Sequence, residues 1–122
     1  MSVNQTPTLG NGSASAAGQA KQFTPTGSSG SGAITTAATD QTALSANATR
    51  NFLQLSVPAS SAGSVTFNIA GLAVYDSTNV AYRGITIPPG GAVIYDAIKG
   101  VTNTLIKAAS PVAGALYDIV EG

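Results

Sequence analysis

The first 40 residues set the strongest limit on the fold, because they hold almost nothing that can build a hydrophobic core. Gly, Ala, Ser and Thr make up 26 of these residues, and Lys21 and Asp40 are the only charged ones. Their large apolar side chains are Met1, Val3, Leu9, Phe23 and Ile34. Burial of so few apolar groups cannot offset the conformational entropy lost when such a segment becomes ordered. We therefore predict an extended arm over residues 1–40 that other subunits hold in shape.

Two Thr-Pro pieces interrupt the Gly- and Ser-rich tether of the arm. Proline favours extended backbone, and each piece carries one apolar side chain that could anchor in a groove. The partner-binding residues predicted in the arm are Leu9, Phe23, Pro25 and Ile34. The alternative is an unstructured leader in which Leu9 and Phe23 have no role.

Residues 41–122 alternate between apolar and polar side chains with the period of a half-buried β-strand. Leu53 and Leu55 would share one face of a strand, and Val65 and Phe67 one face of the next. Gly, Pro and Asp-rich turns separate about seven such segments. The pattern predicts an all-β domain over residues 41–122, a small antiparallel β-sandwich or jelly-roll-like barrel.

Three details of this domain are also predicted. Residues 71–75 and 80–87 each form a strand, the latter with Val80 pointing inward. Residues 92–98 are apolar on both faces, as in a strand that is covered on two sides. A short helix over residues 96–100 is the alternative for the end of that segment. The aromatic side chains, including Phe67 and Tyr117, are expected in the core or at sheet edges.

The charge balance excludes several classes of function. Five Lys and Arg balance five Asp and Glu, and charged residues make up 8% of the chain. We expect no nucleic-acid partner, because no basic cluster is present to neutralise phosphates. A surface this poor in charge suits a protein that is packed against partners.

Catalytic chemistry is equally poorly supported. The chain has no His and no Cys, the usual general base and the strongest nucleophile, and its acidic residues show no ligand-like spacing. We predict no catalytic residues, no metal site and no cofactor, and hence no enzyme. Neither a signal peptide nor a stretch that could span a membrane is evident, so synthesis in the cytoplasm and no membrane partner are expected.

Two arginines in the predicted β-domain, residues 41–122, are candidates for binding a partner. Arg50 opens a predicted strand and Arg83 lies late in another, so each could reach a carboxylate across an interface. We predict both as partner-binding residues; solvated surface arginines are the alternative.

The layout of the body resembles the small β-sandwich decoration or cement proteins on the virions of tailed bacteriophages. The residues that carry the likeness are an Arg-led strand at 49–55, an alternating strand at 65–70, the Pro-Pro-Gly-Gly turn within 84–91, and a last strand ending in Glu121 and Gly122. The resemblance implies a minor capsid protein on the outer shell, often a trimer. Its arm would lie between subunits of the major capsid protein.

The sequence thus predicts a noncatalytic structural protein of the virion, a decoration protein that stabilises the capsid by bridging major capsid subunits. Its predicted partners are the major capsid protein and other copies of itself. Two alternatives stay open. One is a tail, fibre or self-assembling subunit, and the other is a receptor- or carbohydrate-binding module with ligand loops at 76–79 and 100–103.

Overall fold

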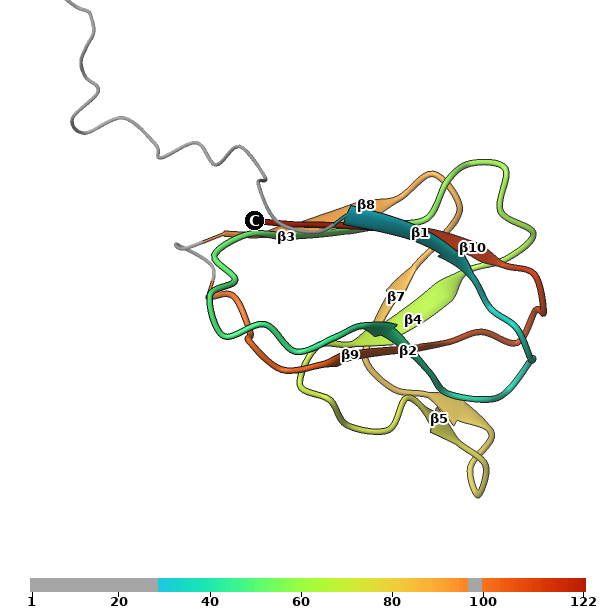
Figure 1. Ribbon diagram of the computed structural model, residues 1–122. Coiled ribbons are helices and arrows are strands. Elements are labelled where there is room, and N and C mark those ends of the chain that lie inside the picture. The colour runs from blue at the N-terminus through green and yellow to red at the C-terminus, as the bar shows by residue number, and fades with distance from the viewer. Residues whose placement is uncertain (1–28, 97–99) are drawn as a thin grey trace, which may run out of the picture.

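The computed structural model describes residues 29–96 and 100–122, which form two four-stranded antiparallel sheets and a separate hairpin (Figure 1). Sheet I has the order β1 (Ser29–Ala33), β10 (Leu116–Glu121), β3 (Leu53–Ser56) and β8 (Ala92–Tyr95). Sheet II has the order β2 (Gln41–Leu44), β9 (Ile106–Ala109), β4 (Val65–Asn68) and β7 (Ile85–Ile87). The hairpin consists of β5 (Tyr75–Asp76) and β6 (Ala81–Tyr82).

The strand order is that of a jelly roll. With β5 and β6 set aside, the chain passes from one sheet to the other at every connection except that from β4 to β7. Eight antiparallel strands wound in this way through two facing sheets make a jelly roll. The predicted all-β class, a small antiparallel sandwich or jelly-roll-like barrel, is confirmed.

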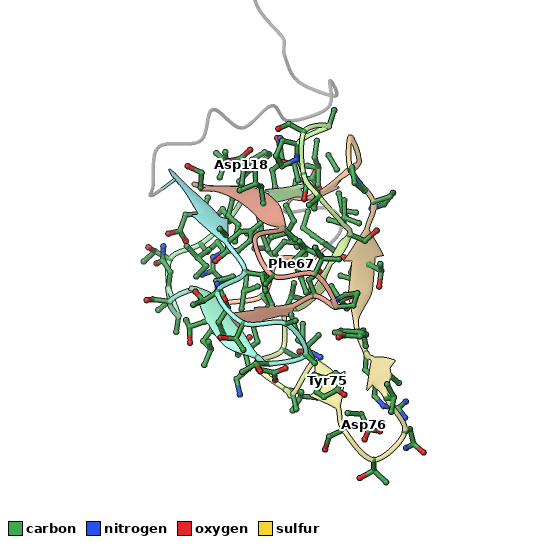
Figure 2. The ribbon with its side chains drawn as sticks, turned by 90° about the vertical axis from the view of Figure 1, so that its right-hand side faces the viewer. Phe67, Tyr75, Asp76 and Asp118 are labelled. Atoms are coloured by element: carbon green, nitrogen blue, oxygen red, sulfur yellow. The ribbon has the colours of Figure 1, made fainter. Side chains whose placement is uncertain are left out.

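The core lies between the two sheets and follows the predicted alternation. Leu53 and Leu55 of β3 point inward with Ile119 of β10, while Val65 and Phe67 of β4 meet them from sheet II. Phe67 is central: its ring meets the ring of Tyr117 edge-on, with centroids 5.7 Å apart and planes at 87°. Figure 2 shows Phe67 in the middle of the side chains that fill the sandwich.

The sandwich begins earlier than predicted, since residues 29–40 belong to it. Ser29–Ala33 pairs with β10 as an edge strand of sheet I, and the following Ile34 is fully buried in the core. A Cβ on Gly32 would lie 2.6 Å from the Tyr117 ring, so the absence of a side chain lets this strand lie flat on the aromatic core. The composition rule fails here because backbone hydrogen bonds to β10, rather than apolar side chains, hold the strand in place.

Three further expectations are wrong. In place of a strand over 71–75, the structure has only Tyr75–Asp76. The predicted strand over 80–87 is divided by Gly84, and Val80 is 72% exposed rather than inward. β8 is an edge strand, and Ile94 on its outer face is 43% exposed, so this strand is not covered on both sides. The alternative helix over 96–100 falls partly outside the described residues.

Candidate interaction site: the projecting hairpin

The β5–β6 hairpin is inserted between β4 and β7 and projects from the sheet II side of the sandwich (Figure 1). Its base is buried: Val74, just before β5, is fully covered, although it is not part of the central core cluster. The hairpin therefore has a packed base of its own and a free tip. An element that leaves a compact body in this way offers a convex contact surface.

The base of the hairpin is held by Asp40, which precedes β2. One carboxylate oxygen of Asp40 accepts a hydrogen bond from the Val74 N–H at 2.9 Å, and the other accepts one from the Tyr75 N–H at 2.8 Å. The Arg83 N–H donates to the Val74 carbonyl at 2.8 Å and closes the pair of strands. On one face the rings of Tyr75 and Tyr82 form a cross-strand pair with centroids 5.1 Å apart.

Asp76 organises the turn at the tip. Its Oδ1 accepts hydrogen bonds from the N–H groups of Thr78 and Asn79 at 3.0 and 3.3 Å. Its Oδ2 accepts from the Asn79 side-chain amide at 2.8 Å and forms an ion pair with Arg83 at 3.0 Å. Both oxygens are thus engaged within the hairpin, and the Asp76 side chain holds the turn in shape.

These contacts lower the pKa of Asp76 from 3.8 to about 2, and the side-chain hydrogen bond from Asn79 is the largest cause, followed by that from Arg83. A carboxyl group whose pKa is lower in the folded state stabilises that state when ionised. The stabilisation is complete above the unfolded pKa of 3.8 and is lost as the pH falls through about 2.

We expect the Asp76 carboxyl to titrate with a midpoint near pH 2 in a carbon-detected NMR titration, with hairpin amide shifts moving together with it. The matched variant Asn79→Ala removes the largest cause and should raise the midpoint toward 3.8. A wild-type midpoint near 3.8, or no response to Asn79→Ala, would contradict the hydrogen-bond assignment.

Val80 ends the turn in an unusual conformation. Its φ is +50°, in the left-handed region that β-branched residues rarely occupy, and its side chain projects into solvent. Backbone strain of this kind is found where function requires a particular presentation of a side chain. The hairpin therefore displays one exposed apolar residue at the end of its turn.

The structure separates the predicted site residues from one another. Arg83 lies on the hairpin, and its side chain is 60% exposed, paired with Asp76. Arg50 is buried, so its prediction as a surface partner-binding residue is wrong: Nε pairs with Glu121 Oε1 at 3.0 Å. The remaining guanidinium nitrogens of Arg50 donate to the carbonyls of Ser45, Thr102 and Thr104. Arg50 is a structural tie between loops and the last strand.

The arm residues have different outcomes. Ile34 lies in the core of its own chain and is not available to a groove on a partner, because the strand before it is paired with β10. Leu9, Phe23 and Pro25 lie outside the described residues. Of the three predicted partner-binding residues that the structure describes, only Arg83 contributes to the projecting hairpin.

Within the described ranges, no group of three His, Cys, Asp or Glu side chains could hold a metal ion. None of the described residues forms a helix long and apolar enough to cross a membrane. No family model matches the chain, and no match was found among curated protein sequences or solved structures. The site must therefore be interpreted from its own geometry.

Sequence reasoning predicted the turn at 76–79 between two strands, but it did not predict that the flanking strands are only two residues long and form a hairpin that projects from the sandwich. The signal for the turn was the Asp76 side chain, which can bond to the backbone after it. Nothing in the local sequence indicates that Val80 takes a positive φ, because valine is a strand former. The Asp40 anchor joins residues that are far apart in sequence, so no local pattern predicts it.

Proposed function

We propose that this chain is a noncatalytic structural protein of a tailed-phage virion, a decoration protein that stabilises the capsid by bridging major capsid subunits. The observation that carries the proposal is the position of β1, the strand through which the chain enters the jelly roll. Residues 1–28 keep the bland composition predicted for an arm, and they lead directly into β1, a Ser- and Gly-rich strand at the edge of sheet I. An arm that starts from an edge strand is suited to pair with sheet edges of neighbouring subunits.

Two further features support a binding role over a catalytic one. Jelly rolls are used in viral capsid proteins and in lectins, although a fold alone does not decide function. The charged side chains of Asp40, Asp76, Arg83, Arg50 and Glu121 all have partners within the chain. Little free charge is left on the body, so docking to a neutral shell would depend weakly on salt.

Tethering explains how such contacts could hold a shell together. Once the jelly roll is docked, the arm experiences a high effective concentration of its own groove, and weak contacts add up to firm attachment. The arm is the part of the molecule that can bridge, and the jelly roll is the part that covers a seam between subunits.

Deletion of residues 1–28 is expected to leave a folded jelly roll that no longer saturates capsid shells. The deletion stops before β1, because removal of Ser29–Ala33 or Ile34 would damage the fold itself. Occupancy on purified shells, measured by cosedimentation, should fall at least tenfold, while the β-type circular dichroism spectrum is unchanged.

The matched control replaces residues 1–28 with a Gly-Ser linker of equal length, which keeps the tether and removes the anchors Leu9, Phe23 and Pro25. It should bind as poorly as the deletion. Wild-type occupancy in the folded deletion variant would refute the arm mechanism. Saturable binding to glycans by that same variant would favour the receptor-binding alternative.

A further inference from the structure

The described residues expose four large hydrophobic side chains, and these fall into two groups on opposite sides of the jelly roll. Leu72 and Val80 belong to the β5–β6 hairpin and the segment that leads into it, on the sheet II side. Ile94 and Leu116 lie on strands of sheet I, on the face that points away from the core. One side of the molecule is therefore a projecting hairpin with one large apolar residue exposed at the end of its turn, and the other is a sheet face.

The outer face of sheet I is nearly free of charge. Strand register places Val120 beside Gln54 and Gln54 beside Ile94, so these side chains form one row across the face. The outward residues of the four strands are Ser31, Ala33, Gln54, Ser56, Ala92, Ile94, Leu116, Asp118 and Val120. Asp118 is the one charged residue in this set, and we call the set the sheet I face.

Asp118 lies in the middle of the sheet I face, between Ser31 on β1 and Ser56 on β3. Its carboxylate makes no hydrogen bond or ion pair with any residue in the part of the chain that the structure describes. Figure 2 shows Asp118 at the opposite end of the molecule from Tyr75 and Asp76 of the hairpin. This half-buried carboxylate, with a serine on either side and no cation beside it among the described residues, can accept charge-assisted hydrogen bonds from a cationic group that approaches from outside.

The hairpin tip offers such a cation. Arg83 has five N–H donors, and its Nε and one terminal nitrogen bond to Asp76, which leaves donors on an exposed guanidinium. Val80 ends the turn three residues before Arg83, with its side chain exposed. The tip thus presents the exposed Val80 and the free N–H donors of Arg83, and the sheet I face presents exposed apolar residues and the Asp118 carboxylate.

We propose that the hairpin of one copy of this chain docks on the sheet I face of a second copy. Val80 packs against the row of Ile94 and Val120, and the free donors of Arg83 bond to Asp118 of the next copy. The occupant is identified by the match between the free N–H donors of Arg83 and the Asp118 carboxylate, which has no partner among the described residues. This inference does not rest on a role in capsids.

The two surfaces are different parts of the chain, so the contact is head to tail. Repetition of such a contact gives a closed ring when the rotation returns to the start and an open filament when it does not. A ring suits a decoration protein that forms trimers, and a filament suits a fibre subunit. A single hairpin buries a small area, so association of one pair is weak and closure strengthens it.

Sedimentation of the full chain over about 1 μM to about 1 mM tests the proposal. The wild type should show a mass that rises with concentration. Val80→Asp and Ile94→Lys should each shift this rise to at least tenfold higher concentration. Both changes suit the fold, since Asp tolerates a positive φ better than Val and Lys is common on edge strands. Ala59→Asp, an exposed site in the turn between β3 and β4, is the control and should behave as the wild type.

Mixing the two variants gives the decisive result. The Val80→Asp copy keeps a working sheet I face and the Ile94→Lys copy keeps a working hairpin, so an equimolar mixture should form a one-to-one dimer and nothing larger. A wild type that stays monomeric throughout, variants that associate like the wild type, or a mixture without a dimer would each overturn the proposal. The experiment uses no capsid, so a negative result would overturn this proposal without testing the arm mechanism.

Discussion

Replacement of Arg50 by alanine is expected to lower the free energy of unfolding by about 3–5 kcal/mol, the range for removal of one partner of a buried ion pair. The Arg50 side chain has no exposed surface and Glu121 has 5%, with Nε and Oε1 3.0 Å apart. The substitution removes the buried cation that faces Glu121, a carboxylate that also accepts a hydrogen bond from the Asn47 side-chain amide. It also leaves the Ser45, Thr102 and Thr104 carbonyls without the donor that joins them.

Urea denaturation followed by circular dichroism measures this loss, and Arg83→Ala is the matched control. Arg83 also makes an ion pair, with Asp76, but on an exposed hairpin, where screening by water leaves little net stabilisation. Its substitution should hardly move the midpoint. Equal stability of the two variants would show that burial of the Arg50 pair has no energetic importance. Arg50→Lys should recover only part of the loss, since an ammonium has three donors and the guanidinium serves four acceptors.

Substitution of Gly84 by alanine is expected to destabilise the protein by about 3–5 kcal/mol, the sum of backbone strain and overpacking. Gly84 lies where the chain returns from the hairpin into β7, with φ at +139°. A Cβ there would overlap the carbonyl oxygen of Phe67, a backbone atom of β4 that cannot move without breaking the sheet.

Gly90→Ala is the control for Gly84→Ala, because Gly90 also has a positive φ, at +88°, but no atom lies within 4 Å of its Cβ position. It should cost only about 1 kcal/mol, the strain of a left-handed alanine. The difference between the two variants isolates the clash with β4. If both variants lose the same stability in thermal melts, the close approach of Gly84 to Phe67 is not a constraint.

The sequence predicted those parts of the fold that depend on local alternation. Leu53, Leu55, Val65 and Phe67 lie in the core as expected, because residues two apart share one face of a strand. Strand order could not be predicted, since β10 pairs with β1 and β3 from distant parts of the chain. The predicted boundary between arm and β-domain at residue 40 was wrong. β1 consists mainly of Ser and Gly, whose side chains give no indication that this strand pairs with β10.

The candidate site was predicted least well, because its geometry depends on contacts between residues that are far apart in the sequence. Arg50 has the pattern of a surface arginine that leads a strand, and only the approach of Glu121 in the fold makes it a buried tie. Val80 continues an apolar alternation and yet lies outside, because the turn organised by Asp76 directs the backbone into the left-handed region. The residues around Arg50 do not indicate that its partner is buried, and the residues around Val80 do not indicate that its φ is positive.

The central place of β10 in sheet I bears on how the protein is made. β10 lies between β1 and β3, so until the tenth strand has been synthesised β1 has no partner in the sheet and β3 has only β8. A ribosome must release nearly the whole jelly roll before that sheet can close, and pairing between such distant segments is intrinsically slow. During this interval the apolar strands are exposed and prone to aggregation, so chaperone demand and expression temperature should govern the yield of folded protein.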